Sequence, residues 1–566
     1  HSFLLTTMAT FGFHIIDVTY KVLNGTPTVF LYGRSETGKQ CCVLVEYLPW
    51  FYALNVDQLK EQIKNLHTTD ANVINVTEVE RTLNEKPVKA WTIAVSQPSG
   101  IPELSKTVRD LGGKTYEYDI PFTRRFLFDA KLAPFSRVYV TGEEIVSLSK
   151  VPVIKASSIR QGDETTLPPK ALAIDIEAYP VMPINYDEHP ILMVAFKGDN
   201  YEKVITWKKC SSAPTYVEFV ESEEEMLKRT IQTIEEYSPD ILTGYYSDGF
   251  DLPYLVKRCK KYDLSFDLGL DKSEVQITKT GETKARITGI AHVDMLRVVK
   301  RLVGRTLKSE SFKLDDVAKE LLGESKHEVS WDALREAWDK HPELLGPFFE
   351  YNLQDARLTY SLFAKFAPTL VELVKIVGLP IAEISRMSFS QLVEVLLLRN
   401  ASFRGEIAPN KPSTYEEQSR EEKRFVGALV HEPTPGLYEG IAVFDYRSLY
   451  PSIIASHNIS LGTLQCDCCA TNVPGLPYHY CQKKKGFIST VIDDLISRRA
   501  RVKLLLKESP DDIFLKARSD ILKLLANSFY GYLGFAPARW YSFECGQATT
   551  AYGRHYITTT IEQARK

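Results

Sequence analysis

The chain has 566 residues, of which 44% are hydrophobic, 25% charged and 11% aromatic. This composition excludes a largely disordered protein, and at roughly 150 residues per domain the length predicts three or four domains. The formal net charge of −3 excludes an overall basic chain, so any nucleic-acid site has to be local. No apolar run approaches the roughly 18 residues that span a membrane, and we predict a cytoplasmic protein without membrane contact.

The N-terminal part alternates short apolar runs with turn residues over 13–60, which predicts β-hairpins. Residues 33–39 fit the G-x-x-x-x-G-K pattern of a phosphate-binding loop. Gln40 stands where that loop has a metal-binding Ser or Thr, and the segment after it is strand-like rather than helical. We therefore interpret residues 33–39 as a hairpin turn.

The middle of the chain begins at a polar, proline-rich stretch, 161–170, which places a domain boundary near residue 165. Strand-like and helical runs then alternate into the 360s, which predicts an α/β domain. Residues 311–400 are mostly helical by pattern, and a proline- and charge-rich stretch from 409 marks a second boundary. Beyond it, an apolar run ending at Asp445 predicts a strand that leads into a helix.

Four carboxylates and a phenol in the α/β domain have spacings suited to metal binding. Asp175 and Glu177 lie two apart on a predicted strand, so both side chains point to the same face. Tyr351 and Asp355 are four apart on a predicted helix and lie one above the other. With Asp251 they form a set of hard oxygen ligands that suits Mg²⁺ or Mn²⁺, and a two-metal site can hydrolyse phosphodiesters. Taken singly, each acid is explained as well by a surface position or a helix cap.

In order and spacing these residues resemble the three motifs of the DnaQ-like, RNase H-like 3′→5′ proofreading exonucleases. The motifs are D-x-E, a Phe-Asp pair formed by Phe250 and Asp251, and Y-x-x-x-D. The resemblance implies catalysis by all five residues and metal binding by the four carboxylates. One position departs from the family, because Tyr246 stands where an Asn precedes the Phe by four residues. Contacts to a frayed DNA strand are therefore expected to differ.

The local basic patch lies in residues 483–507, which hold eight basic residues against two acidic ones. Arg499 and Lys503 are four apart, as are Lys523 and Asn527, so each pair shares a helix face that can hold a triphosphate. In isolation such a helix is equally typical of a solvated surface.

The stretches FDYRSLYPSII and KLLANSFYG resemble motifs A and B of the family B DNA polymerases, and other stretches along nearly the whole chain resemble the archaeal replicative members. The resemblance implies transfer of nucleotides from dNTPs to a primer on template DNA, with two Mg²⁺ or Mn²⁺ ions per active site. Asp445 and the main chain of Tyr446 would bind the metals, and Tyr450 would exclude a 2′-hydroxyl. Nucleotide contacts are implied for Tyr450, Arg499, Lys503, Lys523, Asn527 and Tyr530.

Two further family features are represented with changes or weak matches. The Y-x-G-G/A switch between synthesis and proofreading corresponds to residues 425–428, where Phe425 lacks the hydroxyl. Archaeal members also read template uracil in an N-terminal pocket. The resemblance nominates for it Tyr20, Pro49, Ile101, Ile120, Pro121 and Phe122, which ordinary core packing explains equally well.

The family's motif C, Y-x-D-T-D, has no counterpart in these 566 residues, because no D-T-D occurs in them. By resemblance this motif supplies the second metal-binding aspartate and precedes the thumb, so we expect negligible synthesis by the chain alone. We favour a small second subunit that carries motif C and the thumb; a split intein and a shortened form of a longer chain are the alternatives. A sliding clamp and association with the nucleoid are also expected.

The expected architecture is a multidomain α/β and α+β protein. It comprises an N-terminal β-rich domain (1–164, with 368–409 returning to it), an exonuclease domain (165–367), an incomplete palm (410–486, continued in 541–566) and helical fingers (487–540). Two competing functions remain open, a stand-alone 3′→5′ exonuclease and a non-catalytic scaffold of a replication complex. Retention of the motif A and B residues speaks against the scaffold.

Four cysteines, Cys466, Cys468, Cys469 and Cys481, cluster between motif A and the fingers. Their C-x-C-C spacing lacks the C-x-x-C loop of common zinc sites. Resemblance to thermophilic relatives, whose intracellular proteins can hold disulfides, favours a disulfide here. Zinc binding and free thiols are the alternatives.

Overall fold

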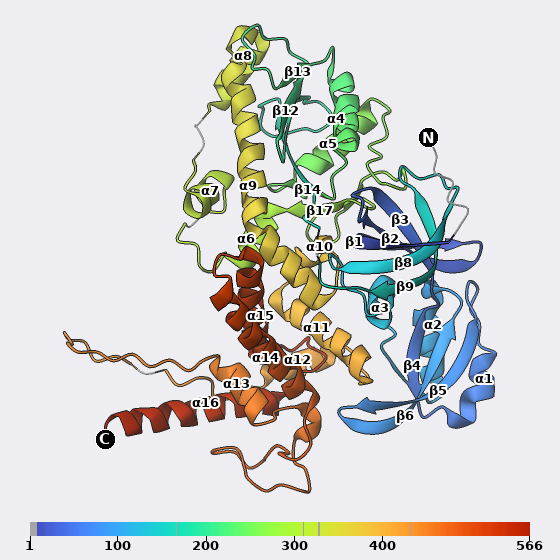
Figure 1. Cartoon of the computed structure of the whole chain (residues 1–566), viewed down its shortest axis with the longest axis vertical. Helices are drawn as coiled ribbons and strands as arrows, with labels where there is room; N and C mark the ends of the chain where they lie inside the picture. Colours follow the sequence, from blue (N-terminus) through green and yellow to red (C-terminus); the bar gives the residue numbers. More distant parts are fainter. Residues whose placement is uncertain (1–7, 166, 310, 326–328, 431) are drawn as a thin grey trace.

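The computed structural model describes residues 8–165, 167–309, 311–325, 329–430 and 432–566. Figure 1 shows a β-rich N-terminal part beside an α/β part and, below the latter, a helical C-terminal part. Helix α9 (Gly346–Val377) runs from the α/β part to the C-terminal helices and ends at Gly378, whose positive φ of 85° closes it. This helix connects the two candidate sites.

The N-terminal part consists of a closed barrel and a four-stranded sheet. The barrel has the order β1 (Ala9–Leu23), β2 (Thr26–Ser35), β3 (Gln40–Glu46), β9 (Val153–Gln161) and β8 (Arg137–Ile145). The sheet has the order β5 (Val73–Leu83), β6 (Lys86–Val95), β4 (Trp50–Leu54) and β7 (Lys114–Tyr116), with helices α1 (Lys60–Lys64), α2 (Ile101–Asp110) and α3 (Phe122–Asp129) in the same part. The predicted hairpins are confirmed, and residues 33–39 form the β2–β3 turn, with Arg34 opposite Gln40.

The α/β part is built on a six-stranded sheet. Its order is β13 (Val217–Phe219), β12 (Tyr201–Thr206), β11 (Ile191–Gly198), β10 (Ala171–Ala178), β14 (Ile241–Gly244) and β17 (Ala291–Asp294). The helices are α4 (Glu223–Tyr237), α5 (Asp251–Lys261), α6 (Met295–Leu302), α7 (Leu314–Leu322), α8 (Trp331–Asp339) and α9, and a hairpin pairs β15 (Gln276–Thr278) with β16 (Lys284–Arg286). The predicted α/β alternation is confirmed. Strand β10 is buried along nearly its whole length, as a strand covered on both faces must be.

The chain returns to the N-terminal part after helices α10 (Ile381–Ile384) and α11 (Phe389–Arg404). The backbone N–H of Ile407 donates to the carbonyl of Thr82 (2.7 Å), and that of Ala408 donates to Glu117 Oε1 (2.7 Å). The segment after α11 is thereby attached to the four-stranded sheet.

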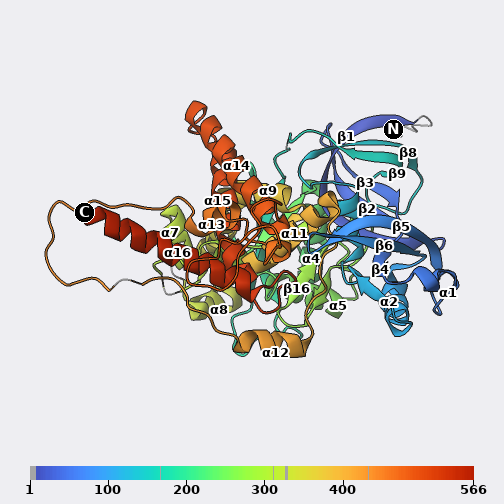
Figure 2. The ribbon, with the colours of Figure 1, turned by 90° about the horizontal axis from the view of Figure 1, so that it is seen from below.

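The C-terminal part is helical. It contains α12 (Thr414–Glu422), α13 (Leu449–Ser456), α14 (Phe487–Glu508), α15 (Ile513–Leu533) and α16 (Phe543–Ala564). Between α12 and α13 the chain leaves the body in a long excursion that extends in the same direction as α16 (Figures 1 and 2). Among the described residues, no helix has both the length and the apolar character of a membrane span.

The strand that we predicted before Asp445 is wrong. Residues 441–446 have no regular secondary structure and are exposed. A strand persists only where neighbours satisfy its N–H and C=O groups, and no described segment pairs with this one. The apolar pattern identified a segment that can form a strand. It does not show whether a second strand is present to pair with it.

Candidate nuclease and nucleotidyl-transfer sites

The carboxylates of the α/β part converge in a cavity of about 580 Å³. Carboxylate oxygens of Asp175, Glu177 and Asp355 lie within 4.8 Å of one another. Tyr351 and Asp251 line the same cavity, so the five residues predicted from spacing are all brought together. A group of acidic oxygens this close suits divalent cations, and these residues could hold them.

The central position of β10 explains how two of these acids face one way. The strand pairs antiparallel with β11 and parallel with β14, so its orientation is fixed from both sides. Asp175 and Glu177 share one face, whereas Ile174 and Ile176 point into the core on the other. Burial of these isoleucines fixes the strand and so holds the two like-charged carboxylates in place.

Asp251 is supplied by the start of α5. The backbone N–H of Ile176 donates to Asp251 Oδ1 (3.2 Å), which ties the helix start to β10. Burial raises the pKa of the Asp251 carboxyl to about 7. Burial, followed by the charges of Asp355 and Asp251, raises the pKa of Asp175 well above its usual range. Carboxyls whose negative charge is this unfavourable favour binding of a cation.

The loop that carries the second motif is held by an acid from β17. Asp294 accepts hydrogen bonds from the backbone N–H groups of Tyr246 (3.0 Å) and Asp248 (3.1 Å). Asp248 in turn pairs with Arg297 (2.9 Å) and Arg386 (3.1 Å). Tyr246, the residue that departs from the family pattern, has a φ of 64° and lines the cavity with its side chain.

Asn352 is a site residue that the sequence analysis missed. Its Nδ2 donates to Asp175 Oδ2 (2.7 Å), and the residue is fully buried on α9. It lies between Tyr351 and Asp355 and is three residues before Asp355, so helix periodicity could have indicated its face. Trp331, at the start of α8, also lines the cavity and lies too far along the chain for spacing to reveal.

The predicted nucleotide-binding residues lie on three helices. Tyr450 on α13 packs against Tyr530 on α15, with ring centroids 4.5 Å apart. A Cβ on Gly553 of α16 would come within 3.0 Å of the Tyr450 ring, so that ring is held between two helices. Asn527, one turn before Tyr530, is exposed on the same helix.

Three basic residues form a cationic face on two of these helices, with Arg499 and Lys503 on α14 and Lys523 on α15. The positive charge of Arg499, followed by burial and by the charges of Arg447 and Lys523, lowers the pKa of the Lys503 ammonium. Arg447, Arg499 and Lys523 therefore lie close enough for their positive charges to act on Lys503, as expected of a surface that binds an anion. The structure brings Arg499, Lys503 and Lys523 together.

Among the described residues, Asp445 belongs to no group of three or more potential metal ligands. It is exposed in the excursion that precedes α13, and the adjacent Tyr446 donates from its hydroxyl to the carbonyl of Tyr556 on α16 (3.2 Å). The switch segment 425–428 is also attached to α16. Arg554 Nη1 donates to the carbonyls of Val426 (2.8 Å) and Gly427 (2.6 Å).

The six residues nominated for uracil lie together. Tyr20, Pro49, Ile101, Ile120, Pro121 and Phe122 line a single cavity of about 320 Å³ in the N-terminal part. The Tyr20 and Phe122 rings meet edge to face with centroids 5.0 Å apart.

The disulfide favoured for the cysteine cluster is not formed. All nine cysteines are free thiols. The physical reason is distance, because the Sγ atoms that approach Cys468 remain 3.5 to 3.8 Å away, whereas a disulfide needs about 2.0 Å.

Comparison with known proteins links these sites to two family models. Residues 379–566 match the model described as DNA polymerase family B, and residues 113–317 match the model of its exonuclease domain. The two matches cover the cationic face and most of the acidic cavity, respectively.

Relatives in sequence and structure agree. The chain is 34% identical over 560 residues to a DNA polymerase of Pyrococcus glycovorans, covering 96% of this chain and 67% of the relative. It is 34% identical over 562 residues to a DNA polymerase of Thermococcus gorgonarius, covering 97% and 68%. A solved structure of the family B DNA polymerase from the hyperthermophilic archaeon Pyrobaculum calidifontis superposes with a TM-score of 0.83 at 27% identity, covering 98% of this chain and 72% of that one.

Proposed function

This chain belongs to the family B DNA polymerases of archaeal type, with an exonuclease domain, and from that premise we propose how it divides synthesis from proofreading. It extends a primer from dNTPs on a DNA template, and its α/β part removes 3′-terminal nucleotides. The observation that carries the proofreading half is the convergence of Asp175, Glu177 and Asp355 in one cavity with Asp251 beside them.

In the exonuclease site the four carboxylates would hold two Mg²⁺ or Mn²⁺ ions, and the chemistry such ions would supply is activation of water and neutralisation of the leaving oxygen. Asn352 orients Asp175 through its amide, and Tyr351 contributes its phenol from the preceding position on α9. Tyr246 and Trp331 offer aromatic faces in the same cavity on which a terminal base can stack.

In the polymerase site Asp445 and the main chain of Tyr446 would hold the metals, and the cationic face would bind the triphosphate. The positive charges of Arg499 and Lys523 lower the pKa of Lys503, which supports a shared anion-binding role for these residues of α14 and α15. Tyr450 packs against Tyr530, and its ring would exclude an incoming nucleotide whose sugar carries a 2′-hydroxyl. Phosphoryl transfer needs little more from a protein than such positioned charges.

Synthesis also requires a second metal-binding aspartate, which we propose comes from a segment outside these 566 residues, in the form of a small subunit with motif C and the thumb. The apolar side chains of the excursion before α13 support this proposal, because Val443 is 86% and Phe444 78% exposed and a further strand could cover them. The sliding clamp would be a partner of the completed enzyme.

The test is primer extension and 3′-end degradation with Mg²⁺, first on this chain and then on its mixture with the small subunit. We expect degradation by the chain alone and synthesis only in the mixture. Synthesis by the chain alone would contradict the proposal that the second aspartate comes from outside.

A stand-alone 3′→5′ exonuclease is the second candidate, favoured by the contrast between four carboxylates that line one cavity and an Asp445 that is exposed. It predicts degradation under both conditions and no synthesis in either. A replisome scaffold predicts neither activity.

Uracil recognition by the N-terminal cavity is proposed on the common lining of its six nominated residues. It predicts tighter binding of single-stranded DNA that contains uracil than of the same DNA with thymine. Equal affinities in fluorescence anisotropy would refute it.

A further inference from the structure

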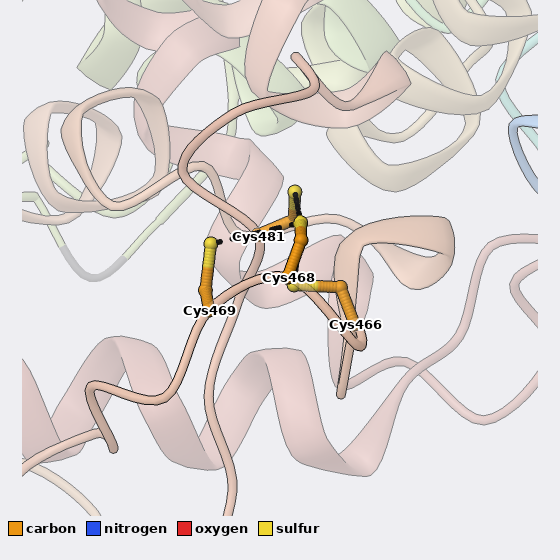
Figure 3. Close-up of side chains that lie close together, drawn as sticks. All are labelled: Cys466, Cys468, Cys469 and Cys481. Carbon is orange, nitrogen blue, oxygen red and sulfur yellow. Dashed lines mark hydrogen bonds between the residues drawn. The ribbon is translucent and has the colours of Figure 1, made fainter.

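A cluster of four thiols lies outside both sites. The Sγ atoms of Cys466, Cys468, Cys469 and Cys481 are all within 4.8 Å of one another. The Sγ of Cys468 is 3.5 Å from that of Cys466, 3.8 Å from that of Cys469 and 3.6 Å from that of Cys481. Figure 3 shows the four side chains approaching one another from two segments of the chain.

We propose that these four cysteines form a closed structural site for one Zn²⁺ ion. A tetrahedral Zn–thiolate centre has Zn–S bonds of about 2.3 Å and therefore S···S edges of about 3.8 Å. The three distances from Cys468 are close to such edges and far from a disulfide bond. The backbone has thus brought together four ligands although the sequence lacks the common C-x-x-C spacing.

The surrounding groups suit thiolates. The backbone N–H of Gln482 donates to Cys469 Sγ (3.4 Å), and that of Lys484 donates to Cys481 Sγ (3.3 Å). Both bonds favour the charged form of sulfur. Lys483, Lys484 and Lys485 follow the last cysteine after one intervening residue, Gln482, and place positive charge near the cluster along the chain.

The ligand set closes at four sulfurs. His479 uses its Nε2 to donate to the carbonyl of Cys466 (2.9 Å), so this nitrogen is already engaged. Soft thiolates select zinc over the hard Mg²⁺ of the catalytic sites. This proposal therefore concerns a different ion and does not depend on the proposed function.

The cysteine cluster lies in a long connection between two helices. About 30 residues connect α13 to α14, with one short 3₁₀ helix among them, η4 (Leu461–Thr463). Connections this long seldom hold one shape without a further constraint. The bridge between Leu464 and Tyr480 brings the two arms together, and a cysteine follows closely on each arm.

Hydrogen bonds connect the cysteine loop to the two helices that flank it. Asn458, just after α13, donates from Nδ2 to the carbonyls of Cys481 (2.5 Å) and Lys484 (2.7 Å), and its Oδ1 accepts from the backbone of Gly486, next to α14. Since α13 carries Tyr450 and α14 carries Arg499, zinc in the loop would fix the bases of two helices that form the nucleotide site.

The test begins with the metal content of the full chain, purified under reducing conditions from zinc-supplemented cells and measured by inductively coupled plasma mass spectrometry. We expect about one zinc per chain. Cys481→Ser and, separately, the exposed Cys468→Ser should each lose most of it. Cys210→Ser is the matched control, because this buried thiol lies in the α/β part beside Ser212, and it should keep the full content.

A second measurement needs no variant. X-ray absorption at the zinc edge should give four sulfurs at about 2.3 Å, and Co²⁺ exchanged into the site should give the charge-transfer spectrum of tetrahedral tetrathiolate cobalt. Removal of zinc should speed proteolytic cleavage within 464–484 by about tenfold or more. No zinc in the chain as purified, unchanged zinc in both cluster variants, or iron with sulfide in place of zinc would each overturn the proposal.

Discussion

The acids of the exonuclease site and the acid of motif A have opposite surroundings. Asp175 stands on a strand paired on both sides, and its neighbours on α9 complete a cavity. Asp445 follows an equally apolar run, yet that run is unpaired and its side chains face solvent. The strands on both sides of β10 hold its two carboxylates in one cavity, whereas no described strand aims Asp445, because two like charges are not held together without packing.

Removing the gathered acids is expected to have the largest effect. Asp175→Ala combined with Glu177→Ala should lower 3′→5′ degradation of single-stranded DNA at least about 10³-fold, because the metals lose two ligands. The rate on end-labelled DNA measures this. Glu221→Ala, which removes an exposed carboxylate of the same domain, is the control and should leave the rate unchanged. Full activity in the double variant would refute the exonuclease assignment.

Asp445→Ala tests the role of the exposed aspartate of motif A in synthesis. We expect synthesis by the completed enzyme to fall at least about 10³-fold while degradation stays intact. Because Asp445 is exposed, thermal unfolding of the chain should not change. Primer extension and calorimetry measure the two effects, with Glu439→Ala, an exposed acid of the same excursion, as the control. Surviving synthesis would show that our motif A assignment is wrong.

Hydrogen exchange asks whether the motif A segment gains a strand neighbour. Amides of residues 441–444 should exchange rapidly in the chain alone and at least about tenfold more slowly once the completing subunit is added. Amides of β10 should be protected in both states, which provides an internal control. Equal exchange of 441–444 in the two states would mean that the segment finds no partner strand there.

Asn352→Leu tests how Asp175 is positioned in the exonuclease site and is expected to have the smallest effect on activity. The variant loses the amide that orients Asp175, and we expect about tenfold slower degradation with a higher Mg²⁺ requirement. A Mg²⁺ titration of the rate separates this positioning role from general damage. Gln354→Leu on the same helix is the matched control. An unchanged Mg²⁺ dependence would exclude a role for Asn352 in placing the metal ligand.

Sequence reasoning succeeded where the signal was local. The hairpin at residues 33–39 was separated from a phosphate loop by Gln40 and the strand after it, and β2 pairs with β3 as expected. The spacing of Tyr351 and Asp355 on a helix was equally local. It failed for Asn352, whose partner lies on β10, and for the strand before Asp445, since strand pairing depends on distant segments.

By itself the sequence determined most of the helices and strands and the family, because side-chain periodicity and motif order are written along the chain. Only the tertiary structure decided which side chains meet. It gathered Asp175 with Asp355, left Asp445 exposed, and brought Cys481 to three cysteines that its spacing did not predict. The physical reason is that contacts between remote residues depend on how whole elements pack, and that packing depends on the apolar surface that each element can bury.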